Sequence, residues 1–282
     1  MDVLPGQVAV ITGGASGIGL AMARRFAAEG MRIVLADIER PVLDRAGKEL
    51  VRAGADVLTV PTDVSLADDV DALAATTIDH FGDVHLVCNN AGVGSRGLTV
   101  ADLPLDDFAW VIGVNLFGVI HGINAFLPRL RANGVGHIVN TASISGFYHL
   151  PRMAPYNASK AAVIALSETL RFELDAEGSG VGVSVLCPSW VRTNISTSDR
   201  NRPERYSYTI ESAQMEEAAE YKARRRQQLA TLALDPTAIA DQVCDAVKND
   251  RFYVLTHPES IPALEERFGR IVAGENPVEP TQ

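Results

Sequence analysis

The sequence predicts an α/β protein in which a doubly wound, parallel sheet of seven strands forms a single domain. Three observations predict it. Short apolar runs, several of them rich in Val, Ile and Leu without in/out alternation, are separated by longer stretches with helical periodicity. A glycine-rich turn joins the first apolar run directly to the first helical stretch. Glycines also stand where four helical stretches should end, at Gly30, Gly54, Gly82 and Gly178.

The elements alternate along the chain in the strand–helix–strand order of a parallel sheet that is covered on both faces. We expect strands at Val8–Thr12, Ile33–Asp37, Val57–Pro61, Leu86–Asn89, His137–Thr141, Val183–Leu186 and Phe252–Leu255. We expect helices at Ile18–Glu29, Pro41–Ala53, Ala67–Phe81, Phe108–Arg131, Pro155–Glu177 and Thr237–Lys248.

Two segments do not fit this alternation. Residues 194–235 are polar, charged and longer than a usual connection, and they contain the helix-like run Glu211–Ala230. Long excursions of this kind are usually lids or binding loops, so we expect a substrate lid here. Residues 257–282 follow the last strand as a C-terminal tail, which we expect either to be partly disordered or to reach a neighbouring subunit.

The composition limits the classes of function. Of the 282 residues, 47% are hydrophobic and 21% are charged, as in soluble globular proteins. The net charge of −10 argues against nucleic acid or an anionic membrane as the partner. The N-terminus has no basic segment before an apolar core, and no uninterrupted apolar run is long enough to span a bilayer. The three cysteines lie far apart, so we expect no metal site, no disulfide framework and a cytoplasmic location.

The first strand leads straight into the sequence Thr12-Gly-Gly-Ala-Ser-Gly-Ile-Gly19 and then into a helix. Its glycines permit a tight turn and a close approach of the backbone to a pyrophosphate, which is attracted to the positive N-terminus of the helix. The alternative is a glycine-rich turn with an N-cap aspartate and no ligand. The residues that we assign to the dinucleotide site here are Gly13, Ser16, Gly17, Ile18 and Gly19.

The second strand ends in Asp37, eighteen residues after the last glycine of the turn. A carboxylate at this place accepts hydrogen bonds from both hydroxyls of an adenosine ribose, and it repels a 2′-phosphate. Neither Arg nor Lys occurs in the glycine turn or directly after Asp37, where Ile38 and Glu39 follow. The sequence therefore favours NAD over NADP.

The carboxyl ends of the third and fourth strands carry further polar residues. Asp63, in Pro61-Thr-Asp-Val64, either caps the next helix or contacts the adenine amino group. The run Asn89-Asn-Ala-Gly92 is either a simple turn or part of the edge where ligands bind in open α/β sheets. We assign to the cofactor site Asp63, Val64, Asn89, Ala91 and Gly92.

Tyr156 and Lys160 are four residues apart at the start of a helical stretch, so their side chains share one face of the helix. Pro155 is tolerated because it falls in the first turn. A free tyrosine has a pKa of about 10, and a cation within roughly 4–6 Å lowers that pKa. With the hydroxyl of Ser143, which could hold a substrate oxygen, the pair suits proton transfer to or from an alcohol. A solvated Tyr–Lys pair without chemistry is the alternative.

Taken together, these motifs resemble the short-chain dehydrogenase/reductase family, and the glycine spacing resembles its short oxidoreductase branch. The resemblance extends to about residue 194 and rests on the runs 12–19, 89–92 and 156–160 with Asn115, Ser143, Pro188 and Thr193. It implies a Rossmann-type fold. It also implies that Tyr156 is the proton donor and acceptor, that Ser143 holds the substrate oxygen, and that Lys160 lowers the tyrosine pKa and binds the nicotinamide ribose. Tyr156 and Lys160 are both also assigned to the cofactor site.

The resemblance implies further roles. Asn115 would anchor a water that links Lys160 to solvent, although its amide could instead satisfy a kinked helix. Pro188, Val191 and Thr193 would hold the nicotinamide carboxamide. Many relatives have Gly after that proline, whereas Ser189 and Trp190 follow here, so the backbone is expected to differ. The family is usually dimeric or tetrameric through the helices of Asn115 and Tyr156, which implies a homo-oligomer, with a homotetramer as our expectation.

Apolar and aromatic residues around the expected pocket favour a bulky hydrophobic or aromatic secondary alcohol. We assign Ser145, Phe147 and Trp190 to the substrate site, and we expect Tyr148, Leu150, Met153, Tyr206, Tyr208, Ile210 and Met215 to add to its lining. The runs 107–115 and 191–206 also resemble the Cα-dehydrogenases that oxidise benzylic alcohols in lignin-derived aryl ethers.

The function that we predict is NAD-dependent interconversion of a secondary alcohol and a ketone, with Tyr156 as the acid and base. One alternative is an NADPH-dependent carbonyl reductase, which Asp37 disfavours. The other is a catalytically silent dinucleotide sensor, which the intact set of Asn115, Ser143, Tyr156 and Lys160 disfavours.

Overall fold

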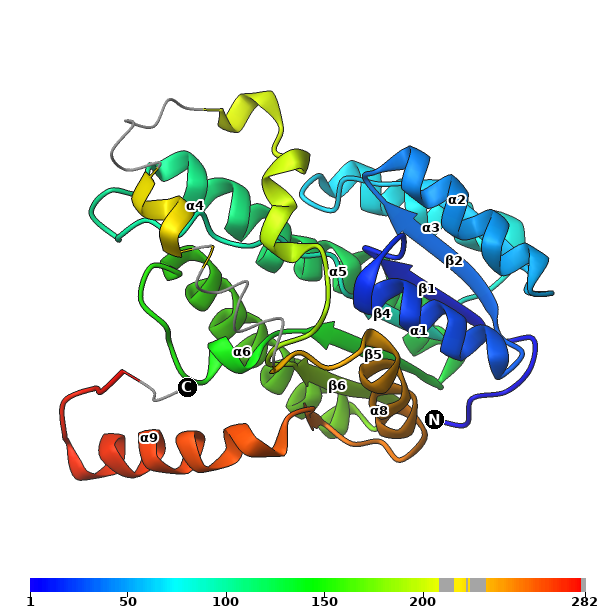
Figure 1. Cartoon of the computed structure of the whole chain (residues 1–282). Coiled ribbons are helices and arrows are strands. Elements are labelled where there is room, and N and C mark those ends of the chain that lie inside the picture. The colour runs from blue at the N-terminus through cyan, green and yellow to red at the C-terminus, as the bar shows by residue number, and fades with distance from the viewer. Residues whose placement is uncertain (208–215, 222, 224–231, 280–282) are drawn as a thin grey trace.

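A parallel sheet of seven strands forms the centre of the protein, in a computed structural model that describes residues 1–207, 216–221, 223 and 232–279 (Figure 1). The strand order is β3-β2-β1-β4-β5-β6-β7. The strands are β1 (Val8–Thr12), β2 (Arg32–Asp37), β3 (Val57–Pro61), β4 (Leu86–Asn89), β5 (Gly136–Thr141), β6 (Val181–Cys187) and β7 (Tyr253–Leu255). The order reverses between β1 and β4, which is where open α/β sheets bind their ligands.

Helices cover both faces of the sheet, so the predicted doubly wound fold is confirmed. They are α1 (Gly17–Ala28), α2 (Arg40–Arg52), α3 (Ala67–Phe81), α4 (Leu105–Ile112), α5 (Gly118–Asn133), α6 (Ala154–Glu177), α8 (Pro236–Lys248) and α9 (Ile261–Ala273). Alternate strand residues enter two cores: Ile11 packs with α1, α2 and α8, and Val10 packs with α3, α5 and α6. Figure 1 shows α1 and α8 in front of the sheet, with α5 and α6 behind it.

The helix expected at Phe108–Arg131 differs from a single α-helix. Between α4 and α5 the chain forms a π turn, η1 (Gly113–Phe117), which holds the buried Asn115. One extra residue in a turn re-aims the side chains around it, and π turns are frequent at functional sites.

The same stretch bears on the expectation about bilayer-spanning runs. Among the described residues, Leu105–Asn133 is one helix that is long and apolar enough to cross a membrane by length and composition alone. The core helix of a soluble protein passes the same test, and 56% of its most apolar window is buried inside this protein. Packing against α3, β4 and α6 therefore accounts for its apolar composition.

The excursion at 194–235 begins and ends at one place. Val191 and Leu234 pair as an isolated parallel bridge, and Arg192 lies 3.0 Å from Asp235 in an ion pair. After Arg192 the chain forms the short helices η3 (Ile195–Asn201) and η4 (Glu204–Tyr206), and residues 216–221 are helical. Most of the run expected at Glu211–Ala230 lies outside the described residues.

The C-terminal segment contains a helix, although one of our two expectations for it was partial disorder. After η5 (Pro258–Ser260), residues 261–273 form α9, so the prediction of disorder is wrong for this part of the tail. The helix is amphipathic: Leu264 is buried, the Phe268 ring contacts Phe147, and Val272 is exposed. The alternative, a contact with a neighbouring subunit, stays a prediction.

Candidate active site

A cavity of about 320 Å³ lies at the carboxyl ends of the strands. Its walls come from the glycine turn, from the ends of β2, β4, β5 and β6, from the start of α6, and from the excursion after residue 191. Its lining includes the carboxyl groups of Asp37, Glu39 and Asp63 and the apolar or aromatic side chains of Trp110 and Tyr148. The cavity is therefore lined by both charged and apolar groups.

The glycine turn presents the start of α1 to this cavity. Gly13 and Gly17 have φ of 62° and 53°, which is left-handed backbone that favours glycine. Ser16 is the N-cap residue of α1, and its side chain makes no capping hydrogen bond. The turn is tightly packed, because a Cβ on Gly19 would lie 2.2 Å from the Gly13 carbonyl oxygen. The positive helix N-terminus can therefore receive an anion such as a pyrophosphate.

Asp37 faces the same cavity from the end of β2. Its carboxylate accepts hydrogen bonds from the Ala15 amide (3.1 Å) and the Glu39 amide (3.0 Å). Burial raises its pKa, and the two amide bonds oppose that shift. The bonds fix the orientation of the carboxylate, as recognition of a ribose requires.

The third strand's carboxyl end places Asp63 and Val64 in the cavity lining. Asp63 does not cap α3, whose N-cap residue is Leu66. Instead its Oδ1 accepts hydrogen bonds from the amide and hydroxyl of Ser65 (3.0 and 2.7 Å), and Arg205 lies 3.4 Å from its Oδ2. Of the two roles considered for Asp63, helix capping is thus wrong.

Asn89 is a correction, because its side chain does not line the cavity. Its Nδ2 donates to the Asn140 side chain (2.9 Å) in the core, and it packs against Gly122. Successive strand residues point to opposite faces, so the next residue, Asn90, faces the ligand edge instead. Asn90 Nδ2 donates to the Thr12 carbonyl (2.9 Å) and so ties β4 to the glycine turn. The assigned Ala91 and Gly92 do line the cavity.

Tyr156 and Lys160 lie one turn apart in α6, which begins at Ala154 with Pro155 in its first turn. The Lys160 Nζ is 5.7 Å from the centroid of the Tyr156 ring and donates to the Thr141 carbonyl (2.7 Å). Lys160 is only 2% exposed, and this burial lowers its pKa to about 8. Below that pH the ammonium is charged and favours the phenolate form of its neighbour.

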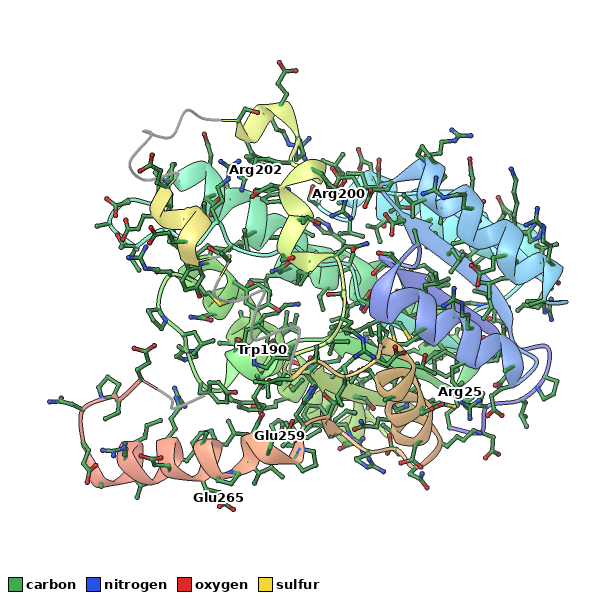
Figure 2. All side chains as sticks on the ribbon, in the orientation of Figure 1. Arg25, Trp190, Arg200, Arg202, Glu259 and Glu265 are labelled. Carbon is green, nitrogen blue, oxygen red and sulfur yellow. The ribbon has the colours of Figure 1, made fainter. Side chains whose placement is uncertain are left out.

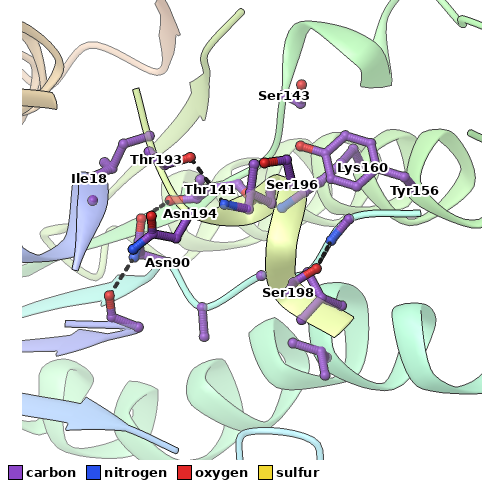
Figure 3. A pocket seen from close by; sticks show the side chains of 18 of the residues that line it. Ile18, Asn90, Thr141, Ser143, Tyr156, Lys160, Thr193, Asn194, Ser196 and Ser198 are labelled. Atoms are coloured by element: carbon purple, nitrogen blue, oxygen red, sulfur yellow. Dashed lines mark hydrogen bonds between the residues drawn. The ribbon is translucent and has the colours of Figure 1, made fainter. Parts of the chain in front are cut away.

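Ser143 faces the cavity beside this pair, and Figure 3 shows it beyond the hydroxyl end of Tyr156. Its Oγ donates to the Pro188 carbonyl (3.2 Å) and accepts from the Ser145 amide (3.1 Å). A hydroxyl rotates to suit its acceptor, so it can turn its proton to a substrate oxygen.

Asn115 lies behind the pair rather than in the cavity lining. Its Oδ1 accepts from the Val93 amide (2.8 Å), and its Nδ2 donates to the Val93 carbonyl (3.0 Å) and the Ser159 hydroxyl (3.2 Å). These bonds satisfy the amide at a distorted helix, as one interpretation expected. The water-anchoring role stays a prediction.

The segment after β6 contributes Pro188, Val191 and Thr193 to the lining, as expected. The sequence did not reveal what holds it. The buried His257, just after β7, accepts from the Ser189 amide at Nδ1 (3.2 Å) and contacts the Trp190 carbonyl through Nε2 (2.9 Å). Because a backbone amide can only donate, a neutral ring carries its proton on Nε2.

Of the residues assigned to the substrate site, Ser145 and Trp190 line the cavity, but Phe147 does not. The Phe147 ring packs instead with Tyr253 (6.2 Å) and Phe268 (6.4 Å), so this assignment is corrected. Tyr206 packs against the cluster of Val93, Trp110 and Val111 and does not line the cavity. Tyr148, Leu150 and Met153 line it as expected. Trp110, Ser198 and Tyr221 also line it, which the sequence did not predict. Tyr208, Ile210 and Met215 lie outside the described residues.

Comparisons with known proteins agree with this geometry. The model of one family, described as short chain dehydrogenase, matches residues 7–204. The C alpha-dehydrogenase of a Sphingobium species is 36% identical over 282 residues, covering 97% of this chain and 88% of that protein. The 1-deoxy-11-beta-hydroxypentalenate dehydrogenase of Streptomyces avermitilis is 36% identical over 270 residues, covering 94% of this chain and 90% of that protein.

Solved structures are similar over the whole chain. A short chain dehydrogenase/reductase from Burkholderia phymatum, in complex with NAD, has a TM-score of 0.95 and 40% identity, covering 100% of both chains. A metagenomic short-chain oxidoreductase in complex with NADP has a TM-score of 0.70 and 28% identity, covering 90% of this chain and 97% of that one. Similar structures therefore hold either dinucleotide.

Proposed function

Because the chain belongs to the short-chain dehydrogenase family, we propose that it is an NAD-dependent oxidoreductase that interconverts a bulky secondary alcohol and its ketone. One observation carries the proposal: Ser143, Tyr156 and Lys160 meet in the cavity whose other end holds the glycine turn and Asp37. We further propose a cytoplasmic homo-oligomer and a lid formed by residues 194–235.

The residues present suit a nicotinamide dinucleotide. The start of α1 offers donors and a positive dipole to the pyrophosphate, and the Asp37 carboxylate offers acceptors to the adenosine ribose. Pro188, Val191 and Thr193, which line the cavity, would hold the nicotinamide carboxamide. When bound, the nicotinamide ring supplies the acceptor or donor of the hydride.

The chain's own residues handle the proton. In alcohol oxidation the Tyr156 phenolate accepts the proton of the substrate hydroxyl, and the buried Lys160 ammonium stabilises that phenolate. Ser143 turns its hydroxyl from the Pro188 carbonyl to the substrate oxygen and so fixes it beside Tyr156. In ketone reduction the hydroxyls of Tyr156 and Ser143 donate to the substrate oxygen, where negative charge develops.

The lining of the cavity by Trp110, Tyr148, Leu150, Met153 and Trp190 supports a bulky hydrophobic or aromatic substrate. The names of the relatives, dehydrogenases of a Cα centre and of a hydroxypentalenate, accord with oxidation of an alcohol. The second candidate is an NADPH-dependent carbonyl reductase, which the NADP complex of a similar oxidoreductase favours and Asp37 disfavours.

The test is NADH or NADPH formation, followed by absorbance, with each oxidised cofactor and a panel of aliphatic, benzylic, steroid and sugar alcohols. We expect turnover of the bulky apolar alcohols with NAD. Turnover with NADP alone would establish the second candidate. Binding of NADH without turnover of any alcohol would support a silent sensor instead.

A further inference from the structure

The structure brings a cation to the adenosine end of the cavity that lies far from it in the sequence. Arg200, in η3, binds Glu39, 161 residues earlier in the chain: Nη2 lies 2.5 Å from Oε1 and Nε 3.2 Å from Oε2. Both side chains line the cavity together with Asp37. Figure 2 shows Arg200 on the segment between the α2 half of the protein and α4.

The guanidinium is held on its other edge as well. Its Nη1 donates to the Asn194 carbonyl (3.3 Å) and to the carbonyl and hydroxyl of Thr197 (3.0 and 3.1 Å). Asn201 Nδ2 adds a bond to Glu39 Oε1 (2.9 Å). The hydrogen bond from Arg200 lowers the pKa of Glu39, so the carboxylate stays charged near neutral pH. The pair is therefore fixed in place by both partners.

This pairing decides what Arg200 can bind. A guanidinium recognises phosphate through two parallel N–H groups, and here the Nε and Nη2 edge is already bound to a carboxylate. The Glu39 amide also bonds Asp37, so the two carboxylates lie together at the end of β2. A 2′-phosphate would meet the Asp37 charge directly and would find the nearby cation occupied.

We propose that Glu39 is a positioning residue for cofactor choice, because it occupies the Arg200 guanidinium and so withholds it from a 2′-phosphate. Asp37 excludes the phosphate directly, and Glu39 acts through Arg200. The proposal rests on the proposed use of NAD. It follows that Arg200 becomes a phosphate-binding residue once both carboxylates are neutralised.

The test measures dissociation constants of NADH and NADPH by fluorescence titration of five proteins: wild type, D37S, D37S/E39Q, D37S/E39Q/R200M and the control D37S/E39Q/R205M. We expect D37S/E39Q to bind NADPH at least about tenfold more tightly than D37S, because the gain corresponds to one charge-assisted hydrogen bond between the freed guanidinium and the phosphate. R200M should then remove that gain while NADH binding changes little. Adding R205M instead removes a cation that pairs with Asp63, not Glu39, and should keep the gain.

The ratio of the two affinities within one protein is the readout, because misfolding would change both affinities alike. Equal NADPH binding with and without the Arg200 guanidinium in the D37S/E39Q background would overturn the role of Glu39. A wild-type protein that binds NADPH more tightly than NADH would instead overturn the proposed use of NAD.

Discussion

Replacing His257 by Leu should loosen the segment that forms one wall of the active site. His257 is 3% exposed and holds the Ser189 amide and the Trp190 carbonyl. The same segment supplies the Pro188 carbonyl, which accepts from the Ser143 hydroxyl (3.2 Å) and the Ile144 amide (3.0 Å). A change at His257 therefore reaches the residue that we assign to the substrate oxygen.

The magnitude follows from what each group loses. The Ser189 amide would be left without its partner, which costs about 1–3 kcal/mol for a buried donor. The Trp190 carbonyl still accepts from the Leu234 amide (3.0 Å), so it loses only one ordinary bond, worth about 1 kcal/mol. The sum predicts that the free energy of unfolding falls by about 2–4 kcal/mol.

The assay is urea unfolding together with steady-state kinetics of NADH formation. We expect His257→Leu to raise KM for the alcohol, because the Ser143 and Trp190 positions become less defined. His257→Gln is the matched control, since its amide offers one acceptor and one donor and should restore much of both quantities. A Leu variant that unfolds within about 0.5 kcal/mol of wild type, with unchanged KM, would refute the reasoning.

Three further predictions concern single residues. Gly19→Ala should abolish detectable NADH binding, because its Cβ would lie 2.2 Å from the Gly13 carbonyl, whereas Gly269→Ala in α9 meets no atom within 4 Å and should bind NADH normally. Asp37→Ala should weaken NADH binding at least about tenfold in a fluorescence titration, through the lost bonds to the ribose; unchanged affinity would remove ribose recognition from the account. Burial lowers the pKa of His137 to about 3, and its pKa in the unfolded chain is about 6.5. Between these values only the unfolded chain binds the proton, so stability is full above pH 6.5 and falls as the pH drops, by about 2 kcal/mol at pH 5; urea unfolding at pH 5 and 7.5 should show this loss in wild type but not in His137→Gln.

Local patterns predicted most of the fold. The bounds of the strands are confirmed to within two residues, because buried parallel strands are short continuous apolar runs, and the helices between them show a clear periodicity and end at glycines. The glycine turn, Asp37 and the Tyr156–Lys160 pair were found for the same reason: each depends on residues that are close in the sequence.

The wrong or missing predictions concern the direction of side chains and contacts between residues that lie far apart in the sequence. Asn89 was assigned to the cofactor site in place of Asn90, because strand alternation sends neighbouring side chains to opposite sides of the sheet and the sequence does not say which side each one faces. Phe147 was assigned to the substrate because α9, which supplies its partner Phe268, was not predicted. Arg200 and His257 were missed because their partners lie 161 and 68 residues away in the chain.

The central claim is that Tyr156 moves the proton in a cavity that binds the dinucleotide independently of that step. The most direct measurement compares wild type with Tyr156→Phe, using NADH formation from a turned-over alcohol and NADH binding by fluorescence. We predict that kcat falls at least about 100-fold, as for loss of a general acid–base group, while the NADH dissociation constant stays within about twofold. A Phe variant that binds NADH and keeps wild-type turnover would contradict the account.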